Sequence, residues 1–254
     1  MSKLRNGPLI EVIFELHWPS NDPQELNSDL NKFEMSLGVI FSALKQDFPK
    51  IIDLRPDIQI PLGIFRDKPT HRFTSNGPEP LNYPLYQLGP GMLTVNTVDE
   101  KYDWDKFSDL ILRINEPLNN LYQFDPNKDL ILVLKYLDFY KLDFNDDIRS
   151  SYRDVFKFQI DLGPAVPKMI NPLLLNIESG YKAQNGTVNF SLKRGSMTKN
   201  GTNLEGIIFE SGIQLRIKAE NYIDTLKKWL HDSHEEISTF FKEITKGSTY
   251  ESFK

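Results

Sequence analysis

The sequence predicts an α+β fold, with a mainly antiparallel sheet and long amphipathic helices packed on one face. Residues 9–18 and 130–142 have the alternating or continuous apolar patterns of strands. The turn signal Gly89-Pro90-Gly91 between two β-rich runs adds a hairpin, which joins antiparallel strands. Three longer segments repeat apolar side chains at helical spacing, namely residues 26–48, 104–122 and 220–245.

We expect two sub-domains that meet near residue 145. Residues 1–145 would form an α+β sub-domain, and residues 146–254 a β-rich sub-domain closed by a long helix. Each half has strands followed by an amphipathic helix, so two similar halves are one interpretation, although the residues show no repeat. A chain of 254 residues is long enough for one large domain or two small ones.

The first strand is expected over residues 9–18. One of its faces carries apolar side chains and the other carries Glu11 and Glu15. This alternation predicts a strand with one packed face and one partly solvated face. Pro19 ends the strand, and the helix over residues 26–48 follows.

Residues 49–84 are harder to assign because prolines interrupt them. Three short β-like runs, at residues 51–54, 58–65 and 71–74, lie between these prolines. A proline cannot donate a hydrogen bond to a strand ladder. We therefore expect edge strands or irregular segments here, followed by a loop at residues 76–84.

The tight turn leads into the second long helix. Pro90 fixes φ at the first central position of the turn, and Gly91 tolerates a positive φ at the next. Asp103 offers a side-chain oxygen as the N-cap of a helix that begins near Trp104. Because Pro117 lies within the helical pattern, we expect a kink or a break two residues before it.

The second half is predicted to contain several strands and one closing helix. Residues 130–142 would form the central strand of the sheet, and Asn185-Gly186 predicts a later hairpin. Residues 196–203 are expected to form an exposed loop. The strands expected after the central one are residues 156–162, 173–183, 187–193 and 204–217.

Composition and charge limit the possible functions. The absence of cysteine excludes disulfides, thiolate zinc sites, thiol nucleophiles and iron–sulfur ligation. The net charge is −5, and residues 1–145 carry 15 Lys and Arg against 21 Asp and Glu, a net of −6. Neither half is basic enough to favour nucleic acid as a partner. No apolar run approaches the roughly 18 residues of a membrane span, so we expect a cytoplasmic protein without membrane contact.

Known catalytic and cofactor motifs are missing from the sequence. It contains neither the Gly-x-x-x-x-Gly-Lys-Ser/Thr phosphate loop nor a Gly-x-Gly-x-x-Gly turn after a strand. It also lacks the Gly-x-Ser-x-Gly nucleophile elbow. We therefore expect no cofactor, and the question of enzymatic activity stays open with the balance against it.

Two histidines, His231 and His234, lie three residues apart in the last predicted helix. With Asp232 or Glu235 they offer the donor types of a metal site. The spacing is not that of a zincin, however, and no third ligand is identifiable, so no metal is predicted. His234 lies at the edge of the apolar stripe. We expect it to pack against the core and hydrogen-bond there, with an acid–base or ligand role as the alternative.

Asp138 interrupts the apolar pattern of the predicted central strand. If it is buried, its carboxylate needs a basic side chain or a backbone N–H as partner, because an unpaired buried charge is costly. The alternative is a pocket carboxylate with a raised pKa. Nothing in the sequence brings Asp138 beside Glu11.

Aromatic side chains gather around the predicted hairpin, at Tyr83, Tyr86, Tyr102 and Trp104. Core packing is the favoured interpretation, and the floor of a pocket or a partner interface is the alternative. The candidate pocket or interface therefore consists of Tyr86, Tyr102, Trp104, Asp138 and His234.

Four segments carry a family resemblance. They are Asn-Gly-Pro-Leu-Ile-Glu-Val-Ile-Phe-Glu-Leu (6–16), Tyr-Gln-Leu-Gly-Pro-Gly-Met-Leu-Thr-Val-Asn with Tyr-x-Trp-x-x-Phe (86–107), Leu-Lys-Tyr-Leu-Asp (134–138) and His-x-x-x-x-x-Phe-x-x-x-Ile-Thr (234–245). In this order they resemble a sporadically distributed bacterial family of uncharacterised proteins of about this length.

The resemblance implies Arg, Asn and Pro where this chain has Lys135, Asp138 and Gly7, which weakens a fixed polar role for position 138. It implies no assigned activity. The patchy distribution is similar to that of accessory genes of mobile elements or defence systems.

These observations lead to three hypotheses. The first is a non-enzymatic cytoplasmic protein that binds another macromolecule, most simply another protein, in an accessory, defence or antitoxin-like role; a homo-oligomer stays open. The second is a small-ligand-binding protein or hydrolase-like enzyme with a carboxylate and histidine pocket near the hairpin at residues 86–104. The third and weakest is nucleic-acid binding through the strands at residues 193–218.

Overall fold

The computed structural model describes residues 4, 6–20, 23–57, 60–77, 82–142, 148–161, 175–199 and 201–254. The helices of this part are α1 (Pro23–Leu44), α2 (Trp104–Tyr122), α3 (Ile148–Phe156), α4 (Tyr222–Ile244) and α5 (Ser248–Glu251), with 3-10 turns η1 (Leu62–Phe65) and η2 (Asp99–Lys101). Its strands are β1 (Leu9–His17), β2 (Lys50–Asp53), β3 (His71–Thr74), β4 (Leu85–Gly89), β5 (Met92–Val98), β6 (Asp129–Lys141), β7 (Ile177–Ala183), β8 (Gly186–Lys199) and β9 (Thr202–Lys218).

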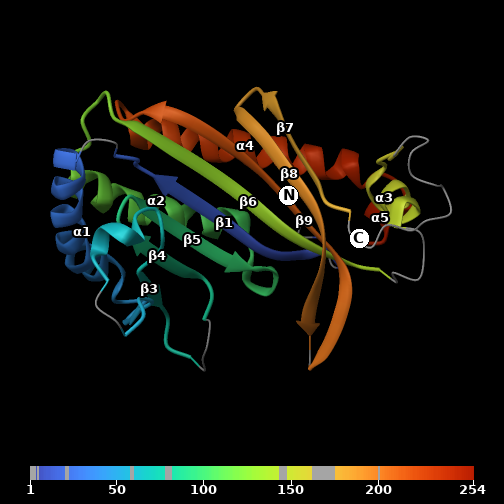
Figure 1. Cartoon of the computed structure of the whole chain (residues 1–254), viewed down its shortest axis with the longest axis horizontal. Helices are drawn as coiled ribbons and strands as arrows, with labels where there is room; N and C mark the ends of the chain where they lie inside the picture. Colours follow the sequence, from blue (N-terminus) through green and yellow to red (C-terminus); the bar gives the residue numbers. More distant parts are fainter. Residues whose placement is uncertain are drawn as a thin grey trace. The chain divides into compact units, whose positions relative to one another are not determined.

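The described strands form one antiparallel sheet in the order β2-β3-β4-β5-β1-β6-β9-β8-β7 (Figure 1). This confirms the predicted α+β class. The packing of all helices on one face and the similarity of the two halves stay predictions. In the part of the chain that the structure describes, no helix has both the length and the apolar character needed to cross a membrane.

Contacts divide the chain into two compact units, and neither unit is continuous in sequence. Unit 1 comprises Met1–Ile10, Lys135–Ile213 and Ser233–Lys254, and unit 2 comprises Glu11–Leu134 and Gln214–Asp232. Strands β1, β6 and β9 and helix α4 therefore contribute a part to each unit. The boundary expected near residue 145 falls outside the described residues and stays a prediction.

Unit 2 is organised around the strands β1 to β5. In β1 the side chains of Val12, Phe14 and Leu16 are fully buried, while the alternate positions are partly exposed, as the alternation predicted. Phe14 is the register partner of Val95 on β5, which is also fully buried. Helices α1 and α2 pack against each other, and α2 contacts β5 (Figure 1).

The hairpin of β4 and β5 is confirmed. Gly89 pairs with Met92, which places Pro90 and Gly91 in the turn, and Gly91 has a φ of 84°. A positive φ of this size at the second central position is typical of a type II turn and suits glycine. The Asp103 side chain then accepts a hydrogen bond from the Lys106 N–H and caps α2, as predicted.

Helix α2 continues through Pro117, so the break expected near Asn115 is wrong, while the alternative of a kink there stays a prediction. Asn115 is fully buried, and its Nδ2 donates to the carbonyl of Ile111 at 2.7 Å. Its Oδ1 accepts the hydroxyl hydrogen of Tyr222. These contacts hold the helix at the turn that the proline weakens, which sequence spacing does not show.

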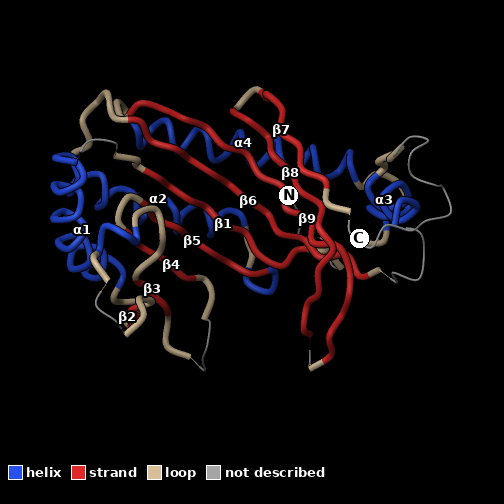
Figure 2. The backbone as a smooth tube through the Cα atoms, viewed as in Figure 1, coloured by secondary structure: helices blue, strands red, loops and turns tan. Residues whose placement is uncertain are grey.

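Unit 1 has its own core, and Figure 2 shows β8 and β9 as two long neighbouring strands. The β7–β8 hairpin is confirmed, with Ala183 paired to Gly186, so Gln184 and Asn185 form the loop. The loop thus begins one residue before the predicted Asn185-Gly186 pair. The core residues of this unit are Tyr140, Tyr152, Phe156, Phe190, Leu192, Ile207, Phe209, Ile244 and Phe253.

Two other expectations are corrected, and for residues 60–65 the structure favours the irregular alternative over an edge strand. The strand expected at residues 156–162 is absent, because Phe156 ends α3 and residues 157–161 have no regular structure; Leu162 lies outside the described residues. The β-like run at 58–65 contains the 3-10 turn η1, and its residues 58–59 are not among those described. The expected loop at 196–203 is largely strand, since β8 ends at Lys199 and β9 begins at Thr202.

Candidate functional site

The predicted site residues fall in both units. Tyr86 on β4 is a core residue of unit 2: its ring meets Phe48 edge-on at 4.8 Å between centroids. Its hydroxyl donates to the carbonyl of Leu110 at 3.2 Å. Burial raises the pKa of this hydroxyl well above its ordinary value. Tyr86 therefore fastens α2 to the sheet.

Tyr102 and Trp104 stand at the start of α2, also in unit 2. Both are half-buried, and their ring centroids lie 6.2 Å and 6.4 Å from that of the buried Phe107. Such edge-on and tilted aromatic contacts stabilise packing. They support the interpretation that these rings anchor the helix.

Asp138 and His234 belong to unit 1. Asp138 is 3% exposed, and its negative charge helps to raise the pKa of the Tyr140 hydroxyl, after the larger effect of burial. His234 is 8% exposed, and its Nδ1 lies 2.8 Å from the hydroxyl of Tyr136. His234 thus packs in the core with a hydrogen bond, while a pocket that combines it with Tyr86 stays a prediction. Among the described residues, no group of three or more His, Asp or Glu side chains is placed to hold a metal ion.

A hollow of ≈ 610 Å³ lies where the edge strand β2 leads into η1 in unit 2. Sequence reasoning missed it, since three prolines made the segment look irregular and a charged pair two residues apart matches no catalytic pattern. Its lining residues are Asp53, Arg55, Pro56, Asp57, Ile60, Pro61 and Phe65.

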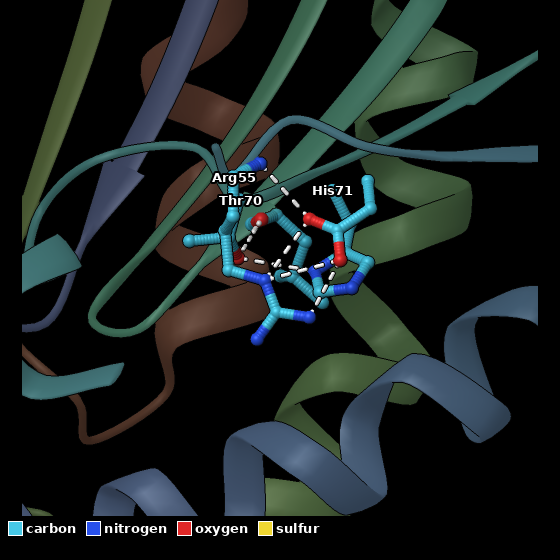
Figure 3. Close-up of polar contacts among 5 residues, drawn as sticks. Arg55, Thr70 and His71 are labelled. Atoms are coloured by element: carbon cyan, nitrogen blue, oxygen red, sulfur yellow. Dashed lines mark hydrogen bonds and ion pairs between the residues drawn. The ribbon is translucent and has the colours of Figure 1, made fainter. Parts of the chain in front are cut away.

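Arg55, which is labelled in Figure 3, lines this hollow and is hydrogen-bonded to Asp53, another of its lining residues. The guanidinium donates from Nε to both carboxylate oxygens at 3.0 and 3.1 Å, and from Nη2 to Oδ2 at 2.6 Å. The backbone N–H of Arg55 donates to Oδ1 at 2.9 Å. These bonds lower the pKa of Asp53 to about 2. The pair is therefore ionised at neutral pH.

His71 lies across from Asp53 on the neighbouring strand (Figure 3). Thr70 donates its hydroxyl hydrogen to the carbonyl of Leu88 at 3.2 Å, so its oxygen is left to accept from Nδ1 of His71 at 3.1 Å. This arrangement fits the neutral imidazole with its proton on Nδ1. Burial lowers the pKa of His71, which favours the same neutral form.

Exposed apolar side chains lie on the elements that adjoin this hollow. Five large hydrophobic side chains are exposed among the described residues, and four lie on α1, β2 and η1: Met35 (63%), Val39 (38%), Ile51 (43%) and Ile64 (62%). Helix α1 contacts η1, and its Phe33 packs on His71 beside β2. We call these four residues, together with Asp53, Arg55 and Asp57, the α1–β2 surface.

Comparisons with protein-family models, with curated proteins and with solved structures found no match. The resemblance to a sporadic bacterial family therefore stays a prediction.

Proposed function

We propose that this chain is a bacterial cytoplasmic protein that acts by binding another protein through the α1–β2 surface. The observation that carries the proposal is that four of the five exposed large apolar side chains among the described residues lie on α1, β2 and η1, the elements that adjoin the Asp53–Arg55 pair. An accessory, defence or antitoxin-like role is consistent with such an activity.

Apolar exposure of this kind marks interaction sites. Monomeric proteins seldom leave large apolar side chains together in water, and clustered ones usually mark a binding surface. Arg55 adds a second feature of interfaces, since arginine is enriched there. Because Asp53 already holds the guanidinium, little side-chain freedom is lost when a partner packs on it.

The edge strand β2 adds backbone hydrogen-bonding groups. The N–H of Leu54 donates to the carbonyl of Thr70 at 2.8 Å, so every second residue of β2 bonds to β3. By this alternation, the backbone groups of Ile51 and Asp53 point to the open edge. An extended segment of a partner could pair there as an added strand.

The charge of the surface selects a basic partner. Asp53 and Asp57 line the hollow, and the charge of Glu34 on α1 helps to raise the pKa of Arg55, after the larger effect of Asp53. Residues 1–145 also carry a net charge of −6, from 15 basic and 21 acidic side chains. We infer that the partner offers an extended segment with apolar and Lys or Arg side chains.

The test is affinity capture from native cells with three forms of the chain. The double variant Met35→Glu/Ile64→Glu should lose at least tenfold of a partner that the wild type retains, because two charges enter the apolar contact. The control is Tyr181→Glu, which alters the fifth exposed side chain, on β7, and should retain it. Identical capture by all three folded forms would contradict the proposal.

A further inference from the structure

Strand β7 belongs to unit 1 and is the last strand in the order of the sheet. Among the strands that the structure describes, it pairs with β8 alone (Figure 1). It contains no proline, and its residues 178–182 are all exposed. Natural edge strands are usually short, bulged or blocked by proline, because an open strand edge invites pairing with another chain. Strand β7 has none of these features over its 7 residues.

The hydrogen-bond pattern of the β7–β8 hairpin decides which backbone groups face the open edge. Ala183 and Gly186 flank the two-residue loop and pair with each other. In such a turn the N–H of the last residue donates to the carbonyl of the first. Bonded and non-bonded pairs alternate along an antiparallel ladder, so the backbone groups of Glu178, Gly180 and Lys182 point away from β8.

These three residues are arranged symmetrically about Gly180. When two copies of β7 lie antiparallel with their Gly180 residues opposite each other, Glu178 of each copy lies opposite Lys182 of the other. This register joins outward-facing backbone groups only to outward-facing ones, and three residue pairs then exchange about six hydrogen bonds. Opposite charges directly across an antiparallel pair stabilise it. The open edge of β7 is therefore complementary to itself.

Both charged side chains are accessible for this contact. Lys182 is exposed and has no ion-pair partner among the described residues. The Glu178 carboxylate is 2.8 Å from Nζ of Lys193 on β8, but its side chain is 68% exposed, and a carboxylate accepts several hydrogen bonds. A register shifted by one bonded pair leaves Glu178 or Lys182 opposite Gly180, so the charges select the symmetric register.

The other face of β7 carries an exposed aromatic ring. Tyr181 packs on Phe190 and Phe240, with ring centroids 6.2 Å and 5.8 Å away, yet it is 39% exposed. In the symmetric register Tyr181 lies opposite Ser179 of the second copy. Because the serine side chain is small, it leaves space for the ring, and the pairing covers part of the exposed apolar surface.

We propose that β7 binds a second copy of this chain by antiparallel strand addition, so that two protomers are related by a two-fold axis at Gly180. A two-fold interface uses the same residues on both protomers, as the charge pattern of β7 requires. In strand addition the main-chain hydrogen bonds provide the affinity, and the side chains provide the specificity. One strand from each protomer buries little surface, so we expect a reversible dimer with a dissociation constant of about 10–100 μM.

The test is sedimentation equilibrium of the full chain at concentrations up to about 500 μM, where such a dimer is well populated. Glu178→Lys and Lys182→Glu should each weaken the dimer about tenfold, because like charges then face each other at both ends of the pairing. An equimolar mixture of the two variants should restore it, since a chain with lysine at both positions meets one with glutamate at both. A wild type that stays monomeric, or charge variants that dimerise like the wild type, would overturn the proposal.

The matched control is Lys246→Glu, which makes the same change of charge at an exposed lysine of unit 1 outside β7. It should dimerise like the wild type. Equal weakening in Lys246→Glu and Lys182→Glu would mean that net charge controls the association, and a mixture no more dimeric than its two components would contradict the register. Capture of a partner through the α1–β2 surface is a separate measurement, so failure of either proposal leaves the other standing.

Discussion

Glu236 on α4 holds the turn that contains Asn185. Its carboxylate accepts the backbone N–H of Asn185 at 3.1 Å and the side-chain Nδ2 of the same residue at 2.8 Å, while its other oxygen accepts the N–H of Gln184 at 3.1 Å. A helix side chain therefore takes the place of water at the loop of the β7–β8 hairpin, and it ties a sheet edge to α4.

Substitution of Glu236 by alanine should loosen this hairpin. Three hydrogen bonds to a charged acceptor would be lost, and since the loop is partly exposed, water would replace them. We expect the free energy of unfolding to fall by about 1–2 kcal/mol, measured by urea denaturation. The matched control is Glu235→Ala at the exposed neighbouring position, which should cost less than about 0.5 kcal/mol. Equal costs at both positions would show that the turn does not depend on Glu236.

The elements with strong local signals were the ones that the sequence predicted well. The turn at Pro90-Gly91 depends on residue types whose backbone preferences are local, and α4 was predicted over residues 220–245 against the observed Tyr222–Ile244. The strand expected at residues 156–162 failed because its apolar residues are also compatible with a helix end. Tyr152 and Phe156, four residues apart, bury one face of α3.

Two glycines, Gly89 and Gly38, differ in the space around the position that an added Cβ atom would take. A Cβ added to Gly89 would lie 1.8 Å from the carbonyl oxygen of Lys68, a clash that backbone movement alone can relieve. Gly89→Ala should therefore lower the free energy of unfolding by at least about 2 kcal/mol. At Gly38, within α1, nothing lies within 4 Å of the added atom. Gly38→Ala should raise the free energy of unfolding by about 0.5–1 kcal/mol, since alanine favours helix.

Thermal and urea unfolding of both variants measure these opposite changes in the free energy of unfolding. A Gly89→Ala variant as stable as the wild type would contradict the close approach of the Lys68 carbonyl to the hairpin.

Most of the polar contacts around the candidate sites could not be predicted from the sequence, because they depend on the register between strands that are distant along the chain. Glu11 and Glu15 were placed correctly on a partly solvated strand face, but their neighbours Asn96 and Thr94 come from β5, more than 70 residues away. No local sequence pattern indicates that Arg72, Gln87 and Thr94 are in register on neighbouring strands. The hollow beside Arg55 was missed for a different reason: apart from Asp53 at the end of β2, its lining comes from proline-rich chain outside the strands.

Arg55 should control the titration of Asp53. In the wild type the pKa of Asp53 is lowered to about 2, with the hydrogen bond from Arg55 as the largest cause. In Arg55→Gln we expect this pKa to return toward about 3.9, the ordinary value for aspartate, as followed by carbon-detected NMR. Because the folded state holds Asp53 ionised, its contribution to stability is present above the unfolded pKa and is lost as the pH falls toward 2. An unchanged Asp53 titration in the variant would contradict this account.

The contribution of Asp29, on α1, to stability should depend on pH in the opposite way to that of Asp53. Burial raises its pKa, Nζ of Lys128 lies 4.0 Å away, and that ammonium group is already bonded to Glu25. A carboxyl whose pKa is raised by folding contributes stability that is present below the unfolded pKa and lost as the pH rises through the folded value. Asp29→Asn should therefore stabilise the protein at pH 7 by about 0.5–1 kcal/mol, and the gain should shrink as the wild-type carboxyl becomes protonated in acid. Urea unfolding across this pH range measures the difference. A variant less stable than the wild type at pH 7 would mean that attraction to Lys128 outweighs the burial of the carboxylate.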